Sequence, residues 1–205
     1  MPLQNRALPT GEIVAIDARG TLTGNRGIIH GPDKQLSTKR WSHHAWICCV
    51  LDWQGRKRDV MSGRKWTELF FLDEATALAA GHRPCGYCRR EAYQAFKQAW
   101  HDAFGGDVGA KQMDQVLHAE RVEPRSRSQK THLAEAKALP SGAMYRYGGK
   151  IYLVADRLVR PFSVKGYGPS ETVPEGKVEV LTPPSLVKVL SAGYKPLLHA
   201  SPFST

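Results

Sequence analysis

The sequence predicts an α+β protein, because short strand-like runs and amphipathic helical segments occupy different stretches of the chain. Gly, Asn and Pro punctuate the apolar runs over 12–32, as they do between short strands. Apolar residues recur at three- and four-residue steps over 89–104, which is the period of a helix with one buried face. A Gly-Gly pair at 148–149 separates two strand-like segments, which is typical of a β-hairpin.

Strands are expected first at 12–16 and then at 46–51, where β-branched and aromatic residues follow one another. A polar turn at Gly55 leads into the segment 57–61, so these segments predict a strand–turn–strand unit. The run 66–72 is expected to form a further strand.

A short helix is expected after Asp73, which suits the N-cap, with strong helix formers following and Gly81 in the C′ position. A second, amphipathic helix is expected over 89–104, where a Gly-Gly pair stops it. Two more helices are expected over 111–121 and 184–190.

The C-terminal part is expected to be rich in strands. A hairpin joins 143–147 to 150–154, and another strand is expected over 177–181. Four Lys or Arg residues and a proline fall within 121–130. This segment predicts a mobile basic loop or lid.

Charge and hydropathy indicate which partners the protein can have. The formal net charge is +10, and a field of that sign attracts polyanions such as nucleic acid. The longest apolar runs fall far short of the roughly 20 residues that a membrane span needs, so no membrane partner is expected. The first residues lack a secretory signal pattern, which favours a cytoplasmic protein.

A Cys-x-x-Cys motif is the most informative feature of the sequence. Pro84 and Gly86 supply the tight turn that lets the thiolates of Cys85 and Cys88 approach one metal ion. A redox pair or two core thiols are the alternatives. Two further cysteines upstream, at positions 48 and 49, favour Zn²⁺.

The run from Asp73 to Cys88, whose core reads Ala-Gly-His-Arg-Pro-Cys-Gly-Tyr-Cys, resembles the second ligand pair of the Ada-type zinc-binding domain. The resemblance covers about residues 40–105, and the core is also similar to that of a group of bacterial proteins. It implies one zinc held by four cysteines, and a link to DNA repair. In the protein that names the family, one cysteine of the first pair accepts a methyl group from a DNA phosphotriester.

The same resemblance carries the family's first ligand over to Cys49, but the family's second cysteine corresponds to Trp53 here. Adjacent strand residues point to opposite faces, so Cys48 should not share the metal with its neighbour. A histidine must then replace the fourth cysteine, or the site is open. His30, His43, His44 and His82 are candidates, and we favour His30 because of its Gly- and Pro-flanked turn.

These features divide the chain into an Ada-like zinc-binding unit over 1–110 and a helix, basic loop and β-rich region over 111–205. Basic residues crowd the cysteine motif, and such residues contact phosphates. The sequence therefore predicts a zinc protein that binds nucleic acid, with DNA favoured. The predicted contacts are Arg56, Lys57, Arg58, Arg64, Lys65, Arg83, Arg89 and Arg90.

Two enzymatic hypotheses remain open. Zinc deaminases pair an H-x-E element with P-C-x-x-C, and this chain has His118, Glu120 and the cysteine motif in the reverse order. A metal-dependent nuclease could instead use His118, Glu120 or His132 beside the basic loop, with the zinc purely structural.

Overall fold

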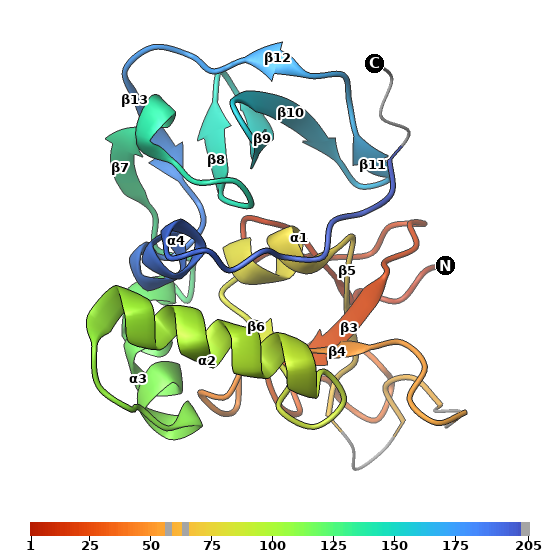
Figure 1. Ribbon diagram of the computed structural model, residues 1–205. Helices are drawn as coiled ribbons and strands as arrows, with labels where there is room; N and C mark the ends of the chain where they lie inside the picture. The colour runs from red at the N-terminus through yellow and green to blue at the C-terminus, as the bar shows by residue number, and fades with distance from the viewer. Residues whose placement is uncertain (56–58, 63–65, 202–205) are drawn as a thin grey trace.

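The computed structural model describes residues 1–55, 59–62 and 66–201. Within these ranges two sheets and four α-helices form an α+β fold whose C-terminal part is rich in strands, as the sequence predicted (Figure 1). One sheet contains strands that precede Cys85, and the other contains strands that follow the third helix.

The first sheet has the strand order β2-β1-β5-β3-β4-β6. Its central strands are antiparallel, whereas β6 lies parallel to β4 at one edge and carries the chain into the cysteine motif. The bounds are β1 (Arg6–Ala7), β2 (Ile13–Val14), β3 (Leu22–Asn25), β4 (Ile47–Val50), β5 (Leu69–Phe71) and β6 (Arg83–Pro84).

The second sheet has the order β11-β10-β9-β8-β13-β7, with β12 also paired to β10. The predicted hairpin is present as β8 and β9, joined by Gly148 and Gly149, both with positive φ as a type I′ turn requires. The bounds are β7 (His132–Glu135), β8 (Met144–Tyr147), β9 (Lys150–Ala155), β10 (Leu158–Ser163), β11 (Gly166–Tyr167), β12 (Glu171–Thr172) and β13 (Lys177–Val180).

The predicted helices are present as α1 (Glu74–Ala79), α2 (Arg90–Phe104), α3 (Ala110–Arg121) and α4 (Pro184–Ser191). The expected strand 57–61 is not: residues 57 and 58 lie outside the described residues, and 59–61 form a turn. Met61 adopts a φ of 52° there, and its N–H donates to Glu68 instead of to a neighbouring strand.

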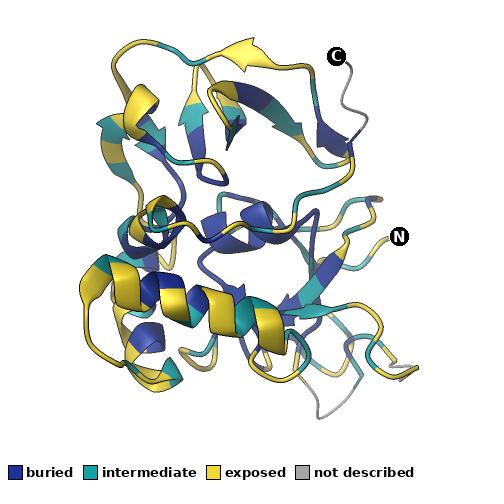
Figure 2. Ribbon diagram, in the orientation of Figure 1, coloured by how far each residue is buried: buried dark blue, intermediate teal, exposed yellow. Residues whose placement is uncertain are grey.

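Helix α1 lies at the centre of the molecule, between the two sheets (Figure 1). All six of its residues are buried, as Figure 2 shows. Ala77 packs in the core cluster of the first sheet, Ala75 and Ala79 pack in a cluster with the second, and Leu78 packs with α2, α3 and α4. Small apolar residues on every face let a short helix connect three parts of the core.

Acidic residues anchor the start of α1. Asp73 caps the helix by accepting from the Thr76 N–H, and also accepts from the Tyr167 hydroxyl. Glu74 forms an ion pair with Arg89 and accepts from the Tyr194 hydroxyl. The amino end of α1 is therefore held by groups from both parts of the chain.

The basic segment 123–130, expected to be mobile, forms a hydrogen-bonded turn. The Glu123 N–H donates to Ser128 and the Arg127 N–H donates to Glu123. The Gln129 amide nitrogen lies within 3.1 Å of the carbonyl oxygens of Pro9, Ala79 and Leu181. One polar side chain thus ties this loop to the first segment, to α1 and to the end of β13.

The expected division at residue 110 stays a prediction. The largest core cluster combines residues from both sides of that boundary, including Phe96 from α2, Met113 from α3 and Leu186 from α4. The ion pair between Arg83 and Asp114 also crosses it.

Gly81→Ala is expected to lower the free energy of unfolding by about 3 kcal/mol, since left-handed strain and overpacking act together. Gly81 has a φ of 81°, and a methyl group there would lie 2.5 Å from Cδ of Arg121, which is buried and cannot retreat. Gly148→Ala is the control, because its φ is 54° and no atom of the described residues lies within 4 Å of the added methyl group. It should cost only about 1–2 kcal/mol. If urea unfolding gives equal losses of stability for Gly81→Ala and Gly148→Ala, Arg121 does not restrict the space at position 81.

Candidate metal centre

The side chains of Cys49, Cys85 and Cys88 lie together, with their sulfur atoms all within 4.8 Å of one another. Strand β6 places the motif there: it pairs in parallel with β4, and the Cys85 N–H donates to the Cys48 carbonyl oxygen at 2.9 Å. The turn after β6 then brings Cys88 back toward Cys49.

The strand register separates the two neighbouring cysteines. Across the sheet, Phe70 pairs with Thr23 and Thr23 pairs with Cys49, so these three residues share one face. Cys48 occupies the opposite face, where it is fully buried in the core of the first sheet. Burial raises the pKa of the Cys48 thiol to about 12, so it stays protonated at neutral pH.

The three clustered cysteines divide their protons unequally. Contact with the sulfur atoms of Cys85 and Cys88 raises the pKa of Cys49, and contact with Cys49 lowers the pKa of the other two. Backbone N–H groups add to this effect; the Tyr87 N–H lies 3.4 Å from the Cys85 sulfur. Ionisation is therefore more favourable at Cys85 and Cys88 than at Cys49.

This arrangement fits a thiophilic metal ion. With Zn–S bonds of about 2.3 Å, tetrahedral geometry places sulfur atoms roughly 3.8 Å apart, within the observed separation. Soft thiolate ligands favour zinc over magnesium or calcium. In the described part of the chain, no fourth Cys, His, Asp or Glu joins this group.

His30 does not lie with the cysteines, contrary to the prediction. The turn that carries it closes by a bridge to Leu36, and its Nδ1 is hydrogen-bonded to the Thr67 hydroxyl at 2.5 Å. The ring is buried in this contact, so His30 is not the fourth ligand of the cluster.

A cavity of about 430 Å³ opens beside the three cysteines, all of which line it. Its other walls are mostly apolar and include Trp53, Trp66 and Phe70. The Trp53 ring contacts that of Tyr87 with centroids 5.4 Å apart. The three cysteines are thus next to a mostly apolar cavity.

Glu68 is a candidate site residue that the sequence analysis missed. Its carboxylate is buried and lines the same cavity. Oε2 accepts from the Met61 N–H at 2.7 Å, but Oε1 has no hydrogen-bond partner among the described residues. Strand alternation places residues 68 and 70 on one face of the predicted strand 66–72, but it does not place that face beside the cysteines.

Two of the predicted nucleic-acid contacts are not available to phosphates. Arg83 forms a bidentate ion pair with Asp114 at 2.8 Å, and Arg89 forms one with Glu74 at 2.7 and 2.8 Å. The side chains of Arg83 and Arg89 are only 7% exposed. Their ion pairs connect the cysteine motif to α3 and α1. Arg90 is exposed. Arg56, Lys57, Arg58, Arg64 and Lys65 lie outside the described residues.

The predicted catalytic residues make contacts of other kinds in the fold. Glu120 accepts from the Ser185 N–H and hydroxyl, so it caps α4. His118 stacks on His44 with ring centroids 3.8 Å apart, and burial followed by the charge of Arg121 lowers its pKa to about 4. His132 lies on β7, and burial lowers its pKa. In the described ranges these residues belong to no metal-binding group.

Comparisons with protein-family models, with curated proteins and with solved structures find no match to this chain. None of the helices in the described ranges has both the length and the apolar composition that crossing a membrane requires. The chain is therefore an α+β protein with a cluster of three cysteines positioned to hold a metal ion.

Proposed function

We propose that this chain is a zinc protein in which Cys49, Cys85 and Cys88 supply three thiolates. The observation that carries the proposal is the convergence of three sulfur atoms from β4 and the Cys-x-x-Cys turn within 4.8 Å. No fourth Cys, His, Asp or Glu of the described residues joins them, so the fourth position would be filled by water or another external ligand. Three protein ligands with one open position are typical of zinc sites that bind or activate a small molecule, whereas structural sites have four.

We further propose that the protein binds nucleic acid, with DNA favoured. The support is the net charge of +10, the exposed Arg90, and two exposed aromatic side chains on the wall of the cysteine cavity. Tyr87 is 66% exposed and Trp66 is 37% exposed, so each offers a ring on which a base can stack. A role in DNA repair rests on the Ada-type resemblance alone.

Glu68 favours a zinc hydrolase as a second candidate function. In zinc deaminases three Cys or His side chains hold the ion, which activates water, while a glutamate that is not a ligand transfers protons. Here Glu68 would hold or move a proton at Oε1, inside the cavity that the cysteines line. In this hypothesis Glu68 is the proton-transferring glutamate, a role for which Glu120 was the candidate in the sequence.

Cobalt substitution tests the metal site. Protein loaded with Co²⁺ should show a thiolate-to-cobalt charge-transfer band and tetrahedral d–d bands, and added imidazole should shift the d–d bands if the fourth position accepts external ligands. Cys88→Ser should weaken the charge-transfer band, whereas Cys48→Ser should leave it unchanged. An octahedral spectrum without charge transfer would exclude the thiolate site.

An oligonucleotide assay separates binding from hydrolysis. A single-stranded DNA that contains all four bases is incubated with the zinc-loaded protein and analysed by mass spectrometry for deamination and for strand cleavage. Turnover that is lost in Glu68→Gln with zinc retained would support the hydrolase, while the exposed Glu91→Gln is the matched control. Salt-sensitive binding without any product would support nucleic-acid binding and exclude hydrolysis of this substrate.

A further inference from the structure

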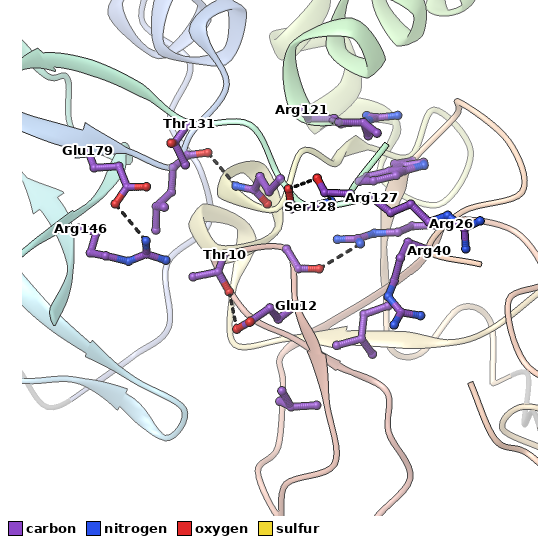
Figure 3. A pocket seen from close by; sticks show the side chains of 18 residues that line it. Thr10, Glu12, Arg26, Arg40, Arg121, Arg127, Ser128, Thr131, Arg146 and Glu179 are labelled. Carbon is purple, nitrogen blue, oxygen red and sulfur yellow. Dashed lines mark hydrogen bonds and ion pairs between the residues drawn. The ribbon is translucent and has the colours of Figure 1, made fainter. Parts of the chain in front are cut away.

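A second cavity, of about 620 Å³, is lined by residues from both sheets and from the turn 126–131. None of the cysteines lines it, so it is separate from the metal centre. Figure 3 shows the charged side chains that surround it. They are Arg26, Arg40, Arg121, Arg127 and Arg146, with Glu12 and Glu179.

The positive charges are unevenly compensated. At one end of the cavity Arg146 forms an ion pair with Glu179 at 2.9 Å, whereas Arg26, Arg40 and Arg127 lie toward the other end (Figure 3). Glu12 accepts from the hydroxyl of Thr10. Among the described residues, no carboxylate lies within 4.0 Å of the other four guanidinium groups.

Two of these arginines are buried. Arg26 is 3% exposed and Arg121 is 1% exposed, and their guanidinium carbons lie 4.1 and 3.9 Å from the ring centroid of Trp46. Arg26 donates to the carbonyl oxygens of Gly11 and Ala80. Arg121 donates to those of Gly81 and His44, while its Nε has no partner among the described residues. The indole and the carbonyl groups fix both cations in place without neutralising them.

Such an arrangement is costly unless a counter-ion completes it. Burial, and then the nearby charge of Arg40, lowers the pKa of Arg26 to about 9, and burial lowers that of Arg121. Buried charges in proteins are normally paired, because desolvation penalises an isolated one. The empty space beside these groups is where an anion would relieve the repulsion.

We propose that this cavity binds a phosphate-bearing anion, with Arg26 and Arg121 in the wall and Arg40 and Arg127 at the rim. Arg40 and Arg127 are exposed, and both are oriented by neighbouring carbonyl oxygens: Arg40 donates to Ser37 at 2.9 Å, and Arg127 donates to Thr38 at 2.6 Å. The guanidinium fork matches the oxygen atoms of phosphate, and several forks can surround one such group.

A phosphate group fits this cavity better than a simple carboxylate. Four unpaired guanidinium groups against one glutamate favour an anion with at least two charges. The hydroxyl groups of Ser126, Ser128 and Thr131 also line the cavity and can donate to further oxygen atoms. The anion can be a small phosphate compound or a phosphate group of nucleic acid.

Calorimetric titration with pyrophosphate in a phosphate-free buffer tests the proposal. The double variant Arg40→Gln, Arg127→Gln should weaken binding at least about tenfold, since it removes two charge-assisted hydrogen bonds. These side chains are exposed, so the variant should fold. Arg125→Gln is the control: it removes one positive charge from the same turn as Arg127, but Arg125 does not line the cavity. It should change affinity by less than about twofold.

Competition identifies the source of the phosphate. If a 5′-phosphorylated oligonucleotide displaces pyrophosphate and its 5′-hydroxyl form does so less well, the site takes a terminal phosphate of nucleic acid. If neither competes, it takes a small phosphate compound. The proposal is overturned if neither pyrophosphate nor the oligonucleotides bind at millimolar concentration, or if the double variant binds pyrophosphate as tightly as Arg125→Gln. None of these results depends on metal.

Discussion

Arg89→Met is expected to lower the free energy of unfolding by about 3–5 kcal/mol, because it leaves a buried charge without its partner. Glu74 is 1% exposed, and Arg89 donates to both of its carboxylate oxygens. After the substitution only neutral donors remain, namely the Tyr194 hydroxyl and the Leu197 N–H. Urea unfolding of the two proteins measures the difference.

The neighbouring residue provides the control for this prediction. Arg90 is exposed and has the same charge and nearly the same place in the sequence, so Arg90→Met should change stability by no more than about 0.5 kcal/mol. Of the predicted phosphate contacts that the structure describes, Arg83 and Arg89 are buried in ion pairs, whereas Arg90 is accessible. A loss from Arg90→Met as large as that from Arg89→Met would contradict the structural role of the Glu74 pair.

Cys49→Ser is expected to remove metal binding and to lower the free energy of unfolding by about 4 kcal/mol or more. A ligand that binds only the folded state stabilises it by about this amount when its free concentration is a thousand times its Kd. Cys48→Ser should cost only about 1–2 kcal/mol, because it changes a core thiol and leaves the metal ligands intact.

Chelation of the metal should affect the stability of Cys48→Ser and Cys49→Ser differently. A chelator should lower the stability of the wild type and of Cys48→Ser, but should have no effect on Cys49→Ser. If Cys48→Ser abolishes metal binding while Cys49→Ser retains it, the strand register that places Cys49 beside Cys85 is wrong.

The helices were predictable because their signals are local. Asp73 caps α1 through a contact three residues away, and Gly81 ends the helix with a positive φ that glycine adopts at no steric cost. The Gly-Gly hairpin is local in the same sense. Such features depend on a few consecutive residues, so they can be predicted from the sequence alone.

The features that the sequence alone could not show depend on contacts between distant residues. The turn 123–130 is held by Gln129, whose partners include Pro9, 120 residues away. Arg83 and Arg89 look like free cations until the fold brings Asp114 and Glu74 to them. A charge count along the chain cannot distinguish a buried ion pair from a phosphate contact.

The candidate site was predictable only in part, for the same reason. The Cys-x-x-Cys spacing indicated two ligands, and the resemblance to the Ada-type domain indicated Cys49. Glu68 joins the same cavity because β3 lies between β4 and β5 and sets their register, which no local pattern specifies.

The metal content of purified protein tests the central claim most directly. Protein isolated without chelators should contain about one zinc ion per chain by elemental analysis, since three thiolates converge on one point. Cys85→Ser should contain almost none, and Cys48→Ser should match the wild type. Metal-free wild-type protein, or unchanged metal content in Cys85→Ser, would contradict the assignment of Cys49, Cys85 and Cys88 as a metal centre.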